Sequence, residues 1–132
     1  MKKQILKPRK TGEQRKRNYR VSIEKRIKRY IKNGGKGDLN LNRTPIKELP
    51  DNLKVGGDLS LTGTPIKELP DSLNVGGSLF LVVTPIEKLP DNLQVDSNLF
   101  LQRTPLSKKY SKEEIRSMIK EKGGYVKRNI MI

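Results

Sequence analysis

Leucines recur along this chain at intervals of twenty residues. Each interval opens with two leucines separated by one residue, and a Thr-Pro dipeptide follows them. The three series are Leu39, Leu59, Leu79 and Leu99; Leu41, Leu61, Leu81 and Leu101; and Thr44, Thr64, Thr84 and Thr104, each followed by proline. A fixed period of this length predicts a solenoid, in which each repeat buries its apolar side chains against its neighbours.

Each repeat is predicted to combine a strand with an extended return. Residues 58–62 alternate polar and apolar side chains, which is the period of a strand. Residues 64–70 contain two prolines, which remove backbone donors and disfavour helix before them, so this segment should run extended along the convex side. We expect Gly56-Gly57 and Gly76-Gly77 to permit a tight turn into the next strand. The strands should therefore stack in parallel, one per repeat.

A helix is predicted before the repeats, over residues 22–32, with Ser22 as its N-cap. Its apolar stripe consists of Ile23, Ile27, Tyr30 and Ile31. Gly34 and Gly35 should end it, since glycine readily takes the left-handed conformation that closes a helix. Because the helix leads into the first strand, we expect it to cap the stack. A membrane-surface helix is the alternative for a segment that is basic on its other face.

A second helix is predicted after the repeats, over residues 111–122. Ser111 and Glu114 have the spacing of a capping box, and Ile115, Met118 and Ile119 give the buried stripe. Residues 126–132 then match residues 95–101 position by position. The sequence therefore predicts a last strand at the end of the chain, with this helix in place of the convex segment of the last repeat.

Composition restricts the chemistry of the chain. Of its 132 residues 33% are hydrophobic, which suits one thin repeat stack better than a large core. Cysteine and histidine are both absent, which removes the commonest nucleophiles, general bases and metal ligands, and no phosphate-binding glycine loop is present. We therefore expect no enzyme, cofactor or metal site. No apolar run approaches the ~20 residues of a transmembrane helix, and we expect a cytoplasmic protein.

Charge is distributed unevenly along the chain, whose net charge is +15. Residues 1–36 carry a net +13, residues 37–106 a net −3 and residues 107–132 a net +5. The sequence predicts a basic, flexible arm at 1–20, a capping helix at 21–36, repeats at 37–106, and a second capping helix with the last strand at 107–132. The expected fold is an α/β solenoid of about five parallel strands with extended convex segments and one amphipathic helix at each end.

The repeat Leu-x-Leu-x-x-Thr-Pro-Ile-x-x-Leu-Pro resembles leucine-rich repeats of the short bacterial class. It is most similar to those of tailed bacteriophages, through Gly-Asp-Leu-x-Leu-x-x-Thr-Pro-Ile, Leu-Pro-Asp-Asn-Leu and the ending at residues 104–110. The resemblance covers residues 37–132 and implies strands along a concave face that recognises a macromolecule. This chain departs from the family where threonine replaces the usual asparagine after the strand, so a continuous asparagine ladder is not expected.

The concave face carries the first candidate site. If the leucines point inward, the alternating residues point outward and form one column down the stack. Its lower half is apolar and aromatic, and the predicted protein-binding residues are Phe80, Val82, Phe100, Gln102 and Met131. Adjacent exposed aromatic side chains favour a partner contact. Packing of the two phenylalanines on each other, or a homodimer interface, is the alternative.

The basic N-terminal arm is the second candidate site, because cations at this density neutralise phosphates and release counterions. The predicted nucleic-acid-binding residues are Lys2, Lys3, Lys7, Arg9, Lys10, Arg15, Lys16, Arg17 and Arg20. Tyr19 and Tyr30 are candidates for stacking on bases. An acidic protein surface as partner and a solvated, solubilising tail are the alternatives.

These features favour a non-catalytic adaptor or inhibitor, phage-encoded if the resemblance holds. Its solenoid would bind a protein, and its arm would bind RNA, DNA or a nucleoprotein complex. We expect no membrane partner and no small-molecule substrate. One alternative is a direct RNA- or DNA-binding protein that uses the repeats as a scaffold, and another is a structural component of a virion.

Overall fold

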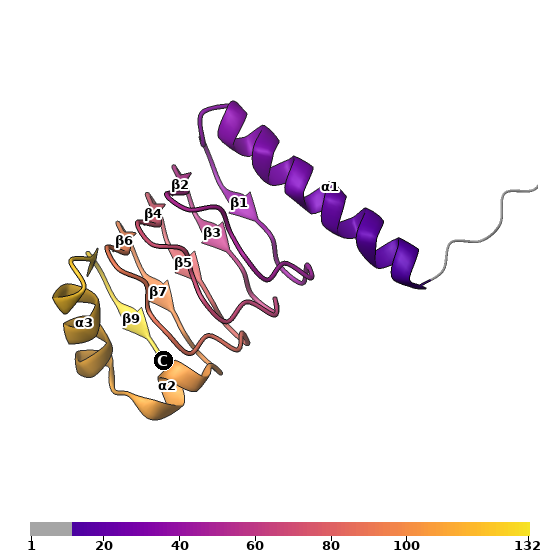
Figure 1. Ribbon diagram of the computed structural model, residues 1–132. Helices are drawn as coiled ribbons and strands as arrows, with labels where there is room; N and C mark the ends of the chain where they lie inside the picture. Colours follow the sequence, from indigo (N-terminus) through magenta and orange to yellow (C-terminus); the bar gives the residue numbers. More distant parts are fainter. Residues whose placement is uncertain (1–11) are drawn as a thin grey trace, which may run out of the picture.

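The fold is a solenoid of parallel β-strands arranged in two sheets, with helices at its two ends (Figure 1). The computed structural model describes residues 12–132, with side chains from residue 22 onward. The first sheet contains β1 (Leu39–Asn40), β3 (Leu59–Ser60), β5 (Leu79–Phe80), β7 (Leu99–Phe100) and β9 (Ile130–Met131), in that order. The second contains β2 (Lys54–Val55), β4 (Asn74–Val75), β6 (Gln94–Val95) and β8 (Tyr125–Val126), in that order.

The twenty-residue period sets the register of the first sheet. Leu39 pairs with Leu59, which pairs with Leu79 and so on, until Leu99 pairs with Ile130 of the predicted last strand. All these side chains are buried, and the leucines two positions later form a second buried column. The predicted strand positions, parallel direction and inward-facing leucines are confirmed.

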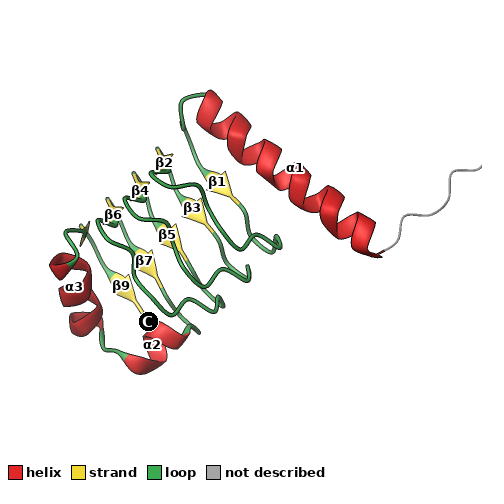
Figure 2. Ribbon diagram, in the orientation of Figure 1, coloured by secondary structure: helices red, strands yellow, loops and turns green. Residues whose placement is uncertain are grey.

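The second sheet was not predicted, because we expected one strand in each repeat. A two-residue strand precedes each turn, and its apolar member is buried, so that Val55, Val75, Val95 and Val126 form another column. Each repeat therefore contributes two short strands joined by a turn and by a longer return (Figure 2). The returns at residues 41–53, 61–73 and 81–93 contain no helix or strand, as their prolines predicted.

The threonine after each strand of the first four repeats closes a turn inside its own repeat. The Thr44 hydroxyl donates to the Leu41 carbonyl at 2.8 Å, and Thr64, Thr84 and Thr104 repeat this contact. All four threonines are buried, and the bond satisfies the hydroxyl without reaching a neighbouring repeat. The hydroxyls of these threonines therefore do not form a ladder between repeats.

A different polar ladder connects the repeats, at the position just before each strand of the first sheet. An oxygen of its side chain accepts the backbone amide of the equivalent residue one repeat later, at 2.7–3.2 Å. The members in order are Asp38, Asp58, Ser78, Asn98 and Asn129. Each step joins neighbouring repeats only, and all steps run in one direction.

The second glycine of each pair serves this ladder and not the conformation of the turn. Gly57 and Gly77 lie outside the left-handed region. A Cβ on Gly57 would fall 2.2 Å from Asp38 Oδ1, and one on Gly77 would fall 2.1 Å from Asp58 Oδ1. One repeat later the ladder residue shortens to serine, and Ser97 takes the glycine position. The glycines thus make room for an aspartate, which corrects our expectation.

The N-terminal helix is longer than predicted: α1 spans Gly12–Lys32. Ser22 lies inside it and is not its N-cap, and residues 12–20 of the predicted flexible arm are helical. Ile23 and Ile27 are buried and Tyr30 is partly buried, as predicted, whereas Ile31 is 47% exposed. Lysine, arginine, glutamate and glutamine favour helix, so the basic segment extends α1 without a hydrophobic period.

The C-terminal end holds two helices, of which one was predicted. Ser111 and Glu114 form the expected capping box, and α3 (Lys112–Glu121) follows with Ile115 and Ile119 buried. The short helix α2 (Pro105–Lys109) was not predicted; Thr104 and Ser107 form a second capping box at its start. The chain then turns through β8 into β9 as the last strand.

Candidate interaction surfaces

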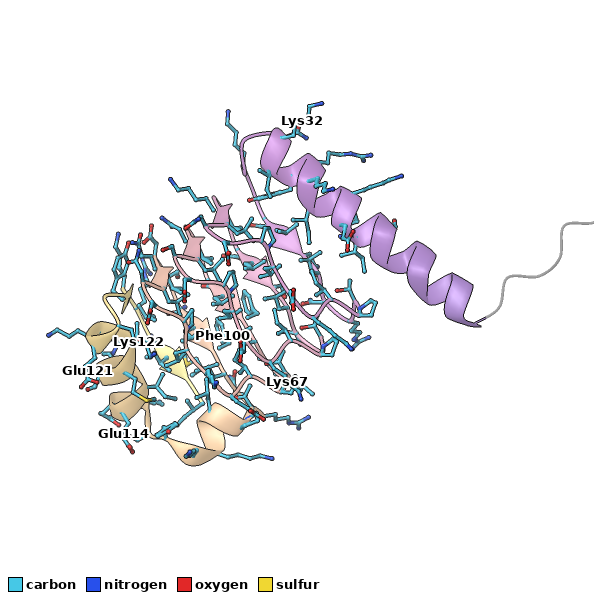
Figure 3. The ribbon with its side chains drawn as sticks, viewed as in Figure 1. Lys32, Lys67, Phe100, Glu114, Glu121 and Lys122 are labelled. Atoms are coloured by element: carbon cyan, nitrogen blue, oxygen red, sulfur yellow. The ribbon has the colours of Figure 1, made fainter. Side chains whose placement is uncertain are left out.

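The five predicted protein-binding residues gather on one side of the first sheet. Phe80 and Phe100 lie on adjacent strands, and Met131 follows in register on β9. Val82 and Gln102 come directly after β5 and β7, and all five side chains are half-buried. We call these five residues the concave surface. Phe100 lies over the body of the stack, whereas Lys32 lies at the end of α1 (Figure 3).

Two phenylalanines dominate the concave surface. Their ring centroids are 4.5 Å apart and their planes differ by 3°, so the rings stack face to face. The parallel register brings this about, because the residue twenty positions after Phe80 is Phe100, which lies directly beside it on the next strand. Each ring thus covers one face of the other, which is the self-packing that the sequence offered as the alternative to a partner contact, and the remaining half-buried surface stays accessible beside Met131.

The first two repeats present polar groups in place of aromatic rings. Asn42 Oδ1 accepts the backbone amide of Thr62 at 3.0 Å and also the hydroxyl of Ser60. Asn40 Oδ1 accepts the amide of Asn42 at 3.0 Å. Asn42 links its own repeat to the next one and Asn40 binds within its own repeat, so this half of the face is polar and the apolar half is separate from it.

Gln102 carries an unpaired acceptor at the edge of the concave surface. Among the residues with described side chains, its Oε1 is the one buried side-chain oxygen or nitrogen that has no hydrogen-bond partner. Such groups are rare in native proteins because an unpaired buried carbonyl loses its hydration without compensation. Sequence reasoning placed Gln102 on this face but gave no sign of the unpaired oxygen.

Helix α1 carries the second candidate surface. Its described cations, Lys25, Arg26, Lys28, Arg29 and Lys32, are all exposed. In the part of the chain with described side chains, none of them lies in an ion pair. We call these five residues the basic face of α1. The first turns of α1 extend beyond the sheets (Figure 1).

The predicted nucleic-acid-binding residues divide between α1 and the segment before it. Arg15, Lys16, Arg17 and Arg20 lie on the backbone of α1, and Lys2, Lys3, Lys7, Arg9 and Lys10 lie outside the described residues. The basic face of α1 continues this run of cations along the same helix, in a segment for which the sequence predicted only a cap. A uniform excess of cations through residue 32 was the signal in the sequence.

The Tyr30 hydroxyl contacts backbone groups, which leaves the ring poorly placed for base stacking. Its hydroxyl lies 2.7 Å from the carbonyl oxygens of both Gly35 and Gly37, and it accepts the Gly56 amide at 3.2 Å. The ring is half-buried against the core. Tyr30 therefore fixes the turn after α1.

An apolar groove separates α1 from the first return of the chain. It has a volume of about 520 Å³, and Ile27, Ile31, Ile46 and Leu49 line it with Pro45. Exposed Ile31 borders this groove, which explains why the predicted stripe is incomplete at its last residue.

Within residues 22–132, no three carboxylate side chains cluster as metal ligands. The side chain of Asp71 binds the backbone of the next repeat, because its Oδ1 accepts the Asp91 amide at 3.0 Å. No helix among the described residues has the length and apolarity that a bilayer requires.

Among the described side chains, Tyr125 has a perturbed pKa. The Tyr125 hydroxyl donates to Asp96 Oδ1 at 2.9 Å, and this hydrogen bond raises the pKa of the phenol above 10.0. Desolvation and the negative charge of Asp96 act in the same direction. Tyr125 is exposed at the C-terminal end, away from both candidate surfaces.

Comparison with known proteins gives no relative. No known protein family matches the chain, and neither the curated proteins nor the solved structures contain a significant match. We therefore infer function from the two candidate surfaces.

Proposed function

We propose that this protein is a non-catalytic adaptor or inhibitor that binds a protein through its concave surface and a nucleic acid or nucleoprotein complex through α1. The observation that carries the proposal is the separation of two unlike surfaces on one rigid scaffold. One is a stacked aromatic pair on the sheet, and the other is a helix with five exposed cations, none of which forms an ion pair with a described residue. Each surface suits a different class of partner.

The concave surface supports the protein partner. Phe80 and Phe100 are already stacked, so a partner that covers them orders little additional side-chain freedom. Such rigid aromatic anchors are typical of binding hot spots. A donor from the partner would also pair with Gln102 Oε1 after a small side-chain rotation, and this would recover the cost of that buried oxygen.

The basic face of α1 supports the nucleic-acid partner. Exposed cations that hold no carboxylate are free to replace the counterions of a phosphate backbone. A helix that extends past the sheets reaches a large nucleic acid without a clash from the repeats. The alternative in which the repeats serve only as scaffold keeps this surface and drops the concave one.

The proposal also includes the class of the repeats and the role of the helices at the two ends. We assign the repeats to the short leucine-rich class and regard α1 and α3 as caps, because each buries two isoleucines against the end of the stack. The resemblance to bacteriophage repeats favours a phage-encoded protein that acts in the cytoplasm of its host.

Capture of partners tests the two surfaces separately. We would immobilise the full chain, expose it to bacterial lysate with and without nuclease, and compare the variant Phe80→Ser/Phe100→Ser with the control Lys67→Ser/Glu87→Ser. The control changes two exposed residues on the returns. The proposal predicts a protein that survives nuclease, is lost with the phenylalanines and is retained by the control. Retention by both variants would assign function to α1 alone.

Titration with nucleic acid tests α1. The variant Lys25→Gln/Lys28→Gln/Arg29→Gln should weaken binding to a labelled duplex and lower the salt dependence by up to about 0.9 in slope for each phosphate contact removed. The control Lys108→Gln/Lys109→Gln/Lys120→Gln removes equal charge at the other end of the molecule. Equal loss in both variants would show attraction by net charge without a dedicated surface.

A further inference from the structure

The C-terminal end of the stack holds a groove that neither proposed surface uses. It lies between α3 and the edge strand β9 and has a volume of about 680 Å³. Ile130 and Met131 form the strand side, and Lys112, Arg116 and Lys120 line the helix side. The groove thus combines the backbone of an edge strand with a row of cations.

The backbone of β9 is unpaired on the side of this groove. In the first sheet, the Leu79 amide donates to the Asn98 carbonyl at 2.9 Å, and the Leu99 amide donates to the Asn129 carbonyl at 2.9 Å. Ile130 holds the same register position on β9, so its N–H and C=O point toward the next strand position. No described residue pairs with them.

The second sheet is closed at this same end by Arg116. The amides of Lys127 and Arg128 donate back to the preceding repeat, so the next repeat would use the carbonyls of Val126 and Arg128. Arg116 occupies both, through Nη1 to Val126 at 2.7 Å and Nη2 to Arg128 at 2.6 Å. A further repeat therefore cannot stack in register, whereas a single strand beside β9 meets an open ladder.

Charge and register describe the strand that fits. Lys112, Arg116 and Lys120 are spaced by four residues, share one helix face and are exposed, while Glu113 is the one carboxylate in the lining. Side chains in register with Ile130 would face α3, and those in register with Met131 would join the open face of the sheet. Alternating acidic and apolar side chains satisfy both sides.

We propose that β9 accepts an extended, acidic segment of a partner protein as an additional strand of the first sheet. The backbone of the segment pairs with Ile130, its carboxylates face Lys112 and Lys120, and its apolar side chains lie beside Met131. Strand addition of this kind takes affinity from main-chain hydrogen bonds and specificity from alternate side chains. The site needs neither Phe80 nor α1, so it stands apart from the function proposed above.

Binding of defined peptides to the full chain tests this site. The probe is a fluorescein-labelled octapeptide of alternating valine and glutamate, with two comparison peptides: one with lysine for glutamate, and one with N-methylated central amides. We expect the acidic peptide to bind, the basic peptide not to bind, and N-methylation to abolish binding because it blocks strand pairing. Amide exchange at Ile130 should slow when the acidic peptide is present.

Variants assign the contact to α3. Lys112→Glu/Lys120→Glu should weaken binding of the acidic peptide by about tenfold or more, since two attractive pairs become repulsive. Lys108→Glu/Lys109→Glu on α2 and Phe80→Ser should leave it unchanged, and circular dichroism checks that each variant is folded. Equal binding of the N-methylated peptide, loss in the α2 control, or protection of Ile130 by a second copy of this chain in sedimentation experiments would each overturn the proposal, as would no binding.

Discussion

At each end of the stack, backbone carbonyls lack the neighbouring repeat that would bind them. The two ends satisfy these carbonyls with different sets of side chains. At the N-terminal end, Arg26 Nη2 donates to the exposed Asn40 carbonyl at 2.8 Å, and Tyr30 holds the first turn. At the C-terminal end, Arg116 takes the two carbonyls that another repeat would use. Helix α3 achieves this in ten residues, whereas α1 has 21. The additional length and charge of α1 are the features that our proposal assigns to a nucleic-acid partner.

The largest expected effect comes from the buried isoleucines of the two helices. Ile115→Ala should lower the free energy of unfolding by about 2–5 kcal/mol, because Ile115 is fully buried. Ile23→Ala should fall near the lower end of that range, since Ile23 borders the groove beside α1 and its surroundings relax more easily. Urea unfolding followed by circular dichroism measures both. A larger loss at Ile23 would mean that α1 is the more important end.

The next effect separates the two arginines. Arg116→Met should cost about 1–3 kcal/mol, because two backbone carbonyls lose a charged donor and one of them is partly buried. Arg26→Met should cost less, since Arg26 serves one carbonyl at an exposed position. Lys120→Met on the exposed side of α3 is the control, with no change expected. Equal losses at Arg26 and Arg116 in urea unfolding would contradict the account of the C-terminal end.

A smaller effect on stability is expected on the basic face of α1. Lys25→Gln/Lys28→Gln/Arg29→Gln should change the free energy of unfolding by less than about 0.5 kcal/mol, because these side chains are exposed and hold no described partner. Unfolding of the triple variant against the parent chain measures it. A loss above about 1 kcal/mol would show that these cations stabilise the fold and would remove the argument from surplus charge.

The smallest effect is a pH dependence at the C-terminal end. The hydrogen bond to Asp96 raises the pKa of Tyr125 above 10.0 in the folded chain. Its contribution to stability is therefore complete below pH 10.0 and is lost as the pH rises through the raised value. Titration by ultraviolet absorbance should show one tyrosine ionising late, and Asp96→Asn should bring it back toward 10.0. An unchanged curve in Asp96→Asn would refute the pairing.

Sequence reasoning succeeded where the period itself decides the structure. Equal spacing placed Leu39 beside Leu59 and Phe80 beside Phe100, and the match of residues 126–132 to residues 95–101 placed Met131 at the end of the same column. The Ser111 capping box was readable because its two residues are local in sequence. The self-packing of the phenylalanines followed from the same register, while the partners of both surfaces stay predictions.

Sequence reasoning failed where structure depends on neighbours in space. Strands such as Lys54–Val55 are two residues long, and only the adjacent repeat makes them strands. The start of α1 lacks a hydrophobic period, since its first turns extend beyond the stack. Arg116 could be placed on α3 from its spacing, yet its contact with two distant carbonyls requires the turn between β8 and β9.

The ladder from Asp38 to Asn129 has a consequence for how such a chain can change length. Each rung reaches only the next repeat, and all rungs run the same way. Duplication of one internal twenty-residue unit would therefore reproduce every contact, provided that each new aspartate is followed one repeat later by glycine. The molecule can in this way acquire a longer face without new side-chain chemistry, and the step from Asn98 to Asn129, which spans 31 residues, keeps the same rung because its additional residues lie in the return.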